Sequence, residues 1–314
     1  MSTAIQTVFA EWTMPPWLTA FILIPACIYL RGWLALRKTR PTQFTTLRLF
    51  SFLSGLATLW ISIASPLDGF ADALLSAHMV EHLLLMSAVP PLVLLAQPVV
   101  PLLRGLPESL RKPILSPLLR LTPLRKFGRW LISPPVAWIA MNATFVGWHV
   151  PSAYDFALRN ETWHDIEHLC FLATSLMFWW SIVRPWPSAR HGMSWGVLLY
   201  LISADLVNTA VSAFLAFCGF PVYTYYVTGA HLFPVSPLSD QVLGAVIMWV
   251  IGSFVFLTPA ALITFRLLQS PLTSTPRPNL EERRTPRPTA THEAPYPPAS
   301  TAPPPPASNA SSRS

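Results

Sequence analysis

The sequence predicts an all-α integral membrane protein. We expect a bundle of seven transmembrane helices, with the N-terminus outside and a disordered Pro-rich tail in the cytoplasm. Two observations support this fold class. The 314 residues are 52% hydrophobic and only 11% charged, whereas soluble domains carry about 25% charged residues. The apolar residues also form runs long enough to cross a bilayer, and many of the 13 tryptophans lie near the ends of these runs, as interfacial belts require.

Seven apolar runs, separated by polar or Pro-containing loops, are the expected spans. They cover residues 17–36, 49–65, 71–97, 135–148, 163–183, 195–217 and 241–268. Within the third run, Pro90 and Pro91 each remove a backbone donor, so we expect a kink or a broken helix there. The basic, Leu-containing stretch 99–129 is expected to lie on an anionic membrane surface, and not to bind nucleic acid.

The distribution of charge and proline predicts the topology and two domains. Residues 1–270 form the expected transmembrane domain, and residues 271–314, with 12 of the 34 prolines, form a tail expected to be disordered. The loops after spans one, three and five, together with the tail, carry nearly every Lys and Arg and are therefore expected in the cytoplasm. No basic segment precedes the first span, so we expect no signal peptide.

Histidines suggest a functional site, because the pattern H-x-x-E-H-L occurs twice, at 78–83 and 164–169. Two imidazoles at i and i+4 lie on one helix face about 6 Å apart along the axis, which is metal-ligand spacing. On the predicted topology both pairs, and the histidine ending the fourth span, lie in the outer half of the membrane. Packing contacts are the alternative interpretation, but ionisable groups inside membranes are usually functional. The sequence therefore predicts an outward-facing metal pocket with five ligands: His78, His82, His149, His164 and His168.

Copper is the favoured metal and zinc the alternative, because imidazole suits both and a thioether favours Cu(I). Met14, in the outer loop, is the better thioether candidate, whereas Met86 and Met141 are expected to be ordinary core residues. Glu81 and Glu167 each precede the second histidine of a pair, and so point about 100° away from it on the helix. We expect these carboxylates to orient an imidazole N–H instead of binding the ion.

Other polar residues are harder to assign. Asp205 lies in the middle of the sixth span with Asn208 one turn on. We expect Asp205 to be either a protonated packing contact or part of an ion path. His191 and His292 are expected to be solvated on the cytoplasmic side, and His231 lies in an outer loop.

Three stretches together resemble a known family. They are HMVEHLLLMSAVPPLVLLAQP (78–98), WHVPSAYDFALRN (148–160) and WHDIEHLCFLATSLMFWW (163–180). With the seven-span layout, they are similar to the polytopic CtaG-type cytochrome c oxidase assembly factors of bacterial membranes. The resemblance implies a non-enzymatic, multi-pass protein of the bacterial inner (cytoplasmic) membrane. It also implies that the protein handles or inserts copper for the catalytic subunit of a haem-copper oxidase, with the metal site on the extracytoplasmic side. The family's histidines map onto the same five positions.

Three other functions stay open on the sequence alone. H-x-x-E-H is also the signature of zinc hydrolases in which two histidines bind the metal and the glutamate activates water, so a membrane-embedded zinc metallohydrolase is the main alternative. Paired histidines could instead ligate haem axially. A transporter or channel is the remaining possibility, but we find no convincing inverted repeat.

Overall fold

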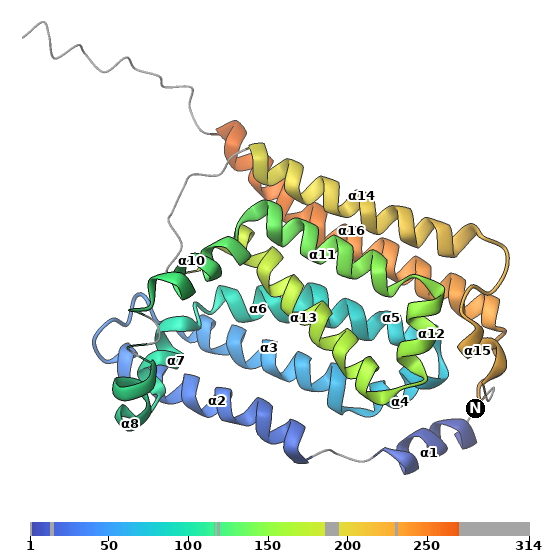
Figure 1. Ribbon diagram of the computed structural model, residues 1–314, viewed down its shortest axis with the longest axis horizontal. Helices are drawn as coiled ribbons and strands as arrows, with labels where there is room; N and C mark the ends of the chain where they lie inside the picture. The colour runs from blue at the N-terminus through green and yellow to red at the C-terminus, as the bar shows by residue number, and fades with distance from the viewer. Residues whose placement is uncertain are drawn as a thin grey trace, which may run out of the picture. The chain divides into compact units, whose positions relative to one another are not determined.

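The computed structural model describes residues 2–12, 16–115, 117, 120–185, 195–229 and 232–269. Within these ranges the regular structure is helical and no strand occurs, which confirms the predicted all-α fold (Figure 1). Several sequence-based expectations fall outside the described residues: Met14, His191, His231, His292 and the whole of the predicted tail, 271–314.

The described ranges contain fifteen α-helices and two π-helical segments. In chain order the α-helices are α1 (Ser2–Glu11), α2 (Pro16–Arg37), α3 (Thr46–Ala64), α4 (Pro66–Ala73), α5 (Leu75–Leu83), α6 (Val89–Leu95), α7 (Val99–Gly105), α8 (Glu108–Leu110), α10 (Thr122–Leu131), α11 (Pro134–Trp148), α12 (Pro151–Leu158), α13 (Glu161–Val183), α14 (Trp195–Phe217), α15 (Thr224–Thr228) and α16 (Pro237–Gln269). The π-helical segments are Leu84–Ala88, between α5 and α6, and Arg111–Leu115.

Six helical segments of the described chain are long and apolar enough to cross a membrane: α2, α3, the segment from α5 to α6 (Leu75–Leu95), α13, α14 and α16. The predicted fourth span forms α11, which has only 15 residues. At 1.5 Å per residue it is about 22 Å long, shorter than the roughly 30 Å hydrocarbon core. The chain is therefore a multi-pass helical membrane protein, whereas the count of seven spans and the orientation stay predictions.

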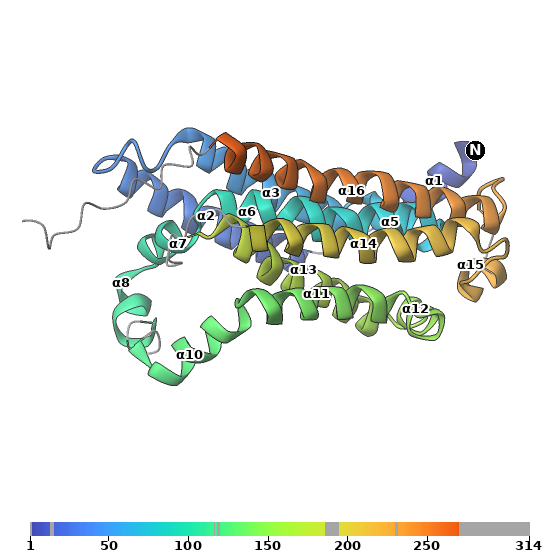
Figure 2. The ribbon, with the colours of Figure 1, turned by 90° about the horizontal axis from the view of Figure 1, so that it is seen from above.

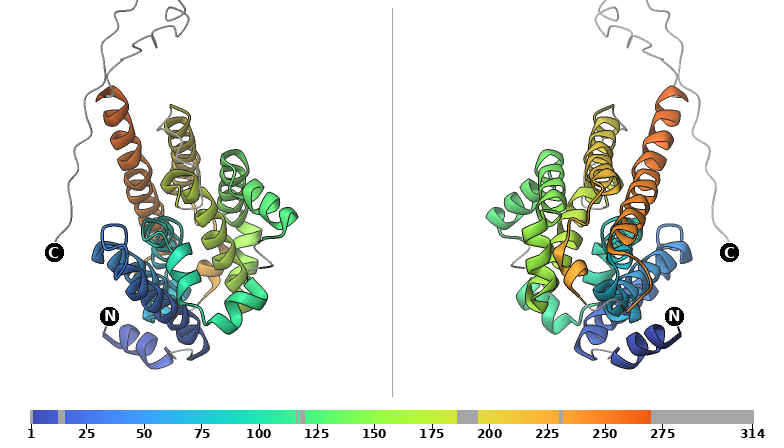
Figure 3. Two further views of the ribbon diagram at one scale, coloured as in Figure 1. Left: turned by 90° about the vertical axis from the view of Figure 1, so that its left-hand side faces the viewer. Right: turned by 90° about the vertical axis from the view of Figure 1, so that its right-hand side faces the viewer.

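The span from α5 to α6 is the central element of the bundle. In it, 56% of the apolar window is buried, against 22–33% in the other five candidate spans. It lies among α3, α13 and α16, with α14 beside α16 (Figure 2, Figure 3). The outer helices instead keep large apolar side chains exposed, such as Phe21, Leu199 and Phe254, each about 70% exposed. Such faces suit lipid acyl chains.

This central span is not one continuous α-helix. The sequence predicts that this span starts near residue 71. This predicted start is wrong, because α4 ends at Ala73 and Leu74 is extended. A new helix, α5, begins at Leu75 because the buried carboxylate of Asp240, on α16, accepts its first free N–H groups. Oδ2 is 2.6 Å from the amide nitrogen of Leu75, and Oδ1 is 3.2 Å from that of Ser76.

A second interruption lies just before the two prolines. The α-helix gives way to a π-helical segment at Leu84 and resumes as α6 at Val89. Pro90 has no N–H to donate to the carbonyl of Met86 four residues earlier. The indole Nε1 of Trp179, on α13, donates to that carbonyl instead, at 3.0 Å. The predicted break is therefore present, and it begins at Leu84, six residues before Pro90.

We predict that Asp240→Ala lowers the stability of the protein by about 1–2 kcal/mol, because the first amides of α5 lose their acceptor. The expected fall in the thermal unfolding midpoint of detergent-purified protein is roughly 2–8 °C. Asp240→Asn is the matched control. It keeps one carbonyl oxygen in place and should fall between the wild type and the alanine variant. An alanine variant as stable as the wild type would contradict the capping role.

Carboxyl groups of α4 and of the beginning of α13 lie close enough to affect one another electrostatically. α4 lies outside the six apolar spans, and burial raises the pKa of its Asp68 to about 7. The neighbouring carboxyls of Asp72, Asp165 and Glu161 add to this rise. The folded protein therefore keeps a proton on Asp68 at pH values where the unfolded chain, with an aspartate pKa near 4, has lost it.

We predict that Asp68 contributes stability at low pH and that this contribution is lost as pH rises from about 4 to 7, because over this window Asp68 binds more proton in the folded state than in the unfolded state. Asp68→Asn, which is neutral at every pH, should lack this contribution, so the stability of the wild type should fall relative to that of the variant across this window. The measurement is the thermal unfolding midpoint at a series of pH values. Glu108→Gln is the control, because Glu108 is exposed and paired with Lys112 at 2.7 Å. Equal slopes for Asp68→Asn and wild type would exclude Asp68 as the cause.

Candidate functional site

The two H-x-x-E-H-L segments form α5 and the beginning of α13, and their side chains meet inside the bundle. On α5, His78 and His82 lie one turn apart with their Nε2 atoms 2.8 Å from each other. On α13, the rings of His164 and His168 have centroids 4.2 Å apart. The i, i+4 spacing therefore places each pair on one face, as expected.

The two pairs also face each other. The rings of His78 and His164 stack with centroids 5.1 Å apart, and those of His82 and His168 lie at 5.4 Å. The potential ligand atoms form two groups, and within each group all of the atoms lie within 4.8 Å of one another. One group is His78, His82 and His168; the other is His78, Glu81 and His164. Four histidines from two distant parts of the sequence thus form one cluster, which we call the imidazole cluster.

The glutamates pair across the helices. Glu167 Oε1, on α13, is 3.7 Å from His82 Nε2, on α5, and Glu81 Oε1, on α5, is 3.8 Å from His168 Nε2, on α13. Each carboxyl group points away from the imidazole next to it in sequence and toward the corresponding imidazole of the other motif. The sequence suggested an orienting role for both glutamates, but the single-helix geometry did not identify the histidine that each one approaches.

The cluster is largely buried, yet many of its polar atoms have no hydrogen-bond partner among the residues that the structure describes. His78 and Glu81 are fully buried, and His82 and Glu167 are 2% and 1% exposed. Burying an unpaired polar group costs about 1–3 kcal/mol, so a concentration of such groups calls for an explanation. The unpartnered buried atoms in this region are His78 Nδ1, His82 Nδ1, His149 Nε2, His164 Nε2, His168 Nε2 and both carboxyl oxygens of Glu81 and Glu167.

His149, the fifth predicted ligand, lies at the edge of the cluster. It follows α11 directly, and its ring centroid is 6.4 Å from that of His82. Its Nδ1 is 2.7 Å from the carbonyl oxygen of Phe145, which can only accept a hydrogen bond. Nδ1 therefore carries the proton and Nε2 keeps a free lone pair. Neither group of ligand atoms within 4.8 Å includes His149.

Three tyrosines, which the sequence analysis did not single out, pack beside the cluster. Tyr154, on α12, is fully buried, and its ring lies 5.2 Å from that of His78. It stacks on Tyr223 at 4.0 Å, and the Tyr223 hydroxyl donates to the carbonyl of His149 at 3.2 Å. Tyr226 donates to the carbonyl of Ala71 at 2.8 Å. Tyr154 lies inside the stretch 148–160 that carries the family resemblance, and this was the one signal that pointed to it.

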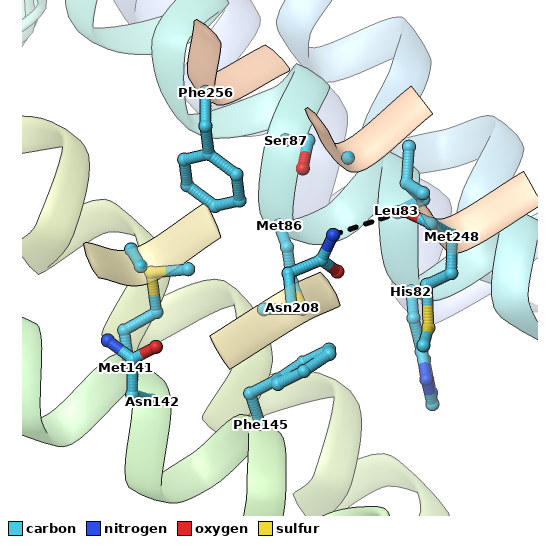
Figure 4. A pocket seen from close by; sticks show the side chains of 12 residues that line it. His82, Leu83, Met86, Ser87, Met141, Asn142, Phe145, Asn208, Met248 and Phe256 are labelled. Carbon is cyan, nitrogen blue, oxygen red and sulfur yellow. Dashed lines mark hydrogen bonds between the residues drawn. The ribbon is translucent and has the colours of Figure 1, made fainter. Parts of the chain in front are cut away.

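His82 also lines a cavity formed with residues of α11, α14, α16 and the π-helical segment that follows α5 (Figure 4). Its lining includes His82, the amides of Asn142 and Asn208, and two methionines expected from the sequence to be ordinary core residues, Met86 and Met141. Both methionines do belong to the hydrophobic core. Asp205 is half-buried and does not line this cavity, and its buried Oδ1 has no hydrogen-bond partner among the described residues.

The chain has relatives among known proteins. The chain is 28% identical over 272 residues to two mycobacterial proteins, Uncharacterized protein Mb0105 of Mycobacterium bovis and Uncharacterized protein MT0111 of Mycobacterium tuberculosis. The matches cover 83% of this chain and 40% of each relative, so the chain spans less than half the length of the curated relatives it matches. No solved structure matches.

A family match covers most of the helical body and all residues of the imidazole cluster. The model of the family described as cytochrome c oxidase caa3 assembly factor matches residues 27–270. This is the family that the three motif-bearing stretches resemble, and an assembly factor agrees with the expectation of a non-enzymatic role. The chain therefore belongs to the Caa3_CtaG family of cytochrome c oxidase caa3 assembly factors.

Proposed function

We propose that this protein holds copper in the imidazole cluster and delivers it to the catalytic subunit of a haem-copper oxidase. The observation that carries the proposal is the meeting of four imidazoles, three of them buried and that of His164 half-buried, whose nitrogens include unpartnered ones among the described residues, in a chain that belongs to an oxidase assembly family. Imidazole is a good ligand for copper. Copper is cargo in this proposal, taken up and released at the extracytoplasmic side.

The carboxyl groups give the cluster a means of balancing charge. A buried cation is costly unless a group of opposite charge lies near it. Glu81 and Glu167 lie within 4 Å of His168 and His82 respectively. Because the Nε2 atoms of His78 and His82 are 2.8 Å apart, one of them carries a proton in the ion-free protein. An ion that binds both nitrogens requires this proton to leave Nε2, and the ring stays neutral when the proton moves to its own Nδ1, which has no hydrogen-bond partner among the described residues. Glu167, with Oε1 3.7 Å from His82 Nε2, would then balance the charge of the ion as a carboxylate.

The contact between His78 and His82 also bears on the haem alternative. Histidines at i and i+4 could serve two haems if each pointed to a separate iron. Here their Nε2 atoms converge to 2.8 Å and so address one shared point. This arrangement favours one small ion over two haem groups.

We predict that the full chain, purified in detergent and loaded with Cu(I), retains about one copper per chain by mass spectrometry. The variant with His78, His82, His164 and His168 all changed to Ala should retain none, because the imidazole ligands are gone. The matched control is His191→Ala/His292→Ala, which removes imidazoles predicted to be solvated. Folding of each variant is checked by its thermal unfolding midpoint.

Two outcomes of this experiment would overturn the proposal. Tightly bound zinc that copper does not displace would move the metallohydrolase to first place. Equal copper in the wild type and in the folded four-histidine variant would exclude the imidazole cluster as the binding site. The partner is tested by measuring copper in the oxidase catalytic subunit made with and without this chain.

The crossed carboxyl groups give a second prediction. Glu167→Gln keeps the shape of the side chain but removes its charge, and should weaken copper binding roughly 10–100-fold. Glu81→Gln should act similarly, since its geometry is nearly the same. The measurement is competition with a Cu(I) chelator of known affinity. Glu161→Gln, an exposed residue in the first turn of the same helix, is the control. Unchanged affinity in both cluster variants would show that the carboxyl groups do not assist binding.

A further inference from the structure

The cavity beside His82 differs in chemistry from the imidazole cluster. It measures about 30 Å³, enough for an ion or one or two waters. Twelve residues from five segments of the described chain line it, and none is acidic or basic apart from His82. A doubly charged ion in such a place would lack the neutralising carboxylates that it needs. The lining therefore suits a singly charged or neutral guest.

Three thioether side chains surround this cavity. Met86, from the π-helical segment, Met141, from α11, and Met248, from α16, are 7%, 4% and 3% exposed. They are three of the eight methionines of the chain, and three separate segments bring them together. Figure 4 shows them around the cavity with His82 and Asn208 among them. Thioether sulfur is a soft ligand that favours Cu(I) over zinc and over hard cations.

Local features of the backbone keep this space open. A Cβ atom on Gly252 would lie 2.7 Å from Asn208 Nδ2, so a larger residue there would push this amide from its present position. Asn208 Nδ2 donates to the carbonyl of Met248 at 3.4 Å. Met86 lies in the π-helical segment, and π-helical turns inside α-helices occur often at functional sites. Methionine side chains are flexible enough to fill irregular gaps in a core. The three methionines that line this cavity nevertheless leave part of it empty.

His82 belongs to both sites. Its Nε2 faces His78 in the imidazole cluster, while His82 also lines the cavity and its buried Nδ1 has no hydrogen-bond partner among the described residues. We propose that Met86, Met141 and Met248 form a second, thioether subsite for a soft monovalent cation, and that His82 passes the ion between this subsite and the imidazole cluster. The transfer step rests on the proposed copper function, whereas the subsite itself does not.

The test uses Ag(I), a soft monovalent ion that prefers sulfur, with the full chain in detergent. The wild type should bind about one Ag(I) with sulfur neighbours in its X-ray absorption spectrum. The variant Met86→Leu/Met141→Leu/Met248→Leu should bind Ag(I) at least about 10-fold more weakly, because leucine keeps the volume but has no donor. Met177→Leu is the control, since Met177 lies on α13 and does not line the cavity.

Two results would overturn the subsite. One is an absorption spectrum of the Ag(I)-loaded wild type without sulfur neighbours, and this needs no variant to fold. The other is unchanged Ag(I) affinity in the triple-leucine variant. These failures are distinct from failure of the copper function. If the histidines bind no Cu(I) but Ag(I) still binds through sulfur, the subsite stands and the copper function fails. If Cu(I) binds through nitrogen and the methionines bind no Ag(I), the copper function stands and the subsite fails.

Discussion

The structure depends on how the backbone of the central span is hydrogen-bonded where its α-helix is interrupted. In a bilayer no water reaches a free amide or carbonyl, so each must find a partner within the protein. Asp240, from α16, accepts the first amides of α5, and Trp179, from α13, donates to the carbonyl that Pro90 leaves free. Both interruptions are therefore tied to neighbouring helices. These ties fix the position of the short segment that carries His78, Glu81 and His82 between them.

The same neighbouring helix supplies the other half of the site. α13 provides Trp179 near the middle of the central span, at Met86, and His164, Glu167 and His168 nearer its beginning. The bond that satisfies the backbone and the contacts that form the imidazole cluster therefore belong to one helix–helix interface. A change in the packing of these two helices would alter both together.

Sequence patterns were sufficient for part of this arrangement. Composition predicted the helical membrane fold, and the i, i+4 histidines predicted one ligand-bearing face on each motif helix. The crossed Glu–His pairs could not be predicted, because the direction of Glu81 on its own helix says nothing about which residue of α13 faces it. The break at Leu74 was missed for a similar reason. Its cause, Asp240, lies 165 residues from the amide of Leu75 that it accepts. The cavity between Met86, Met141 and Met248 likewise depends on three segments far apart in the chain.

The near-equivalence of the two motif helices has a kinetic consequence. His78 faces His164, His82 faces His168, and the crossed carboxyl contacts are 3.7 Å and 3.8 Å. Each histidine thus has a counterpart on the other motif helix, although His164 is half-buried whereas the other three are buried. Under the proposed copper function, an ion that leaves one imidazole would find another beside it, so its ligands could be replaced one at a time. Such a centre would be suited to handing its ion on.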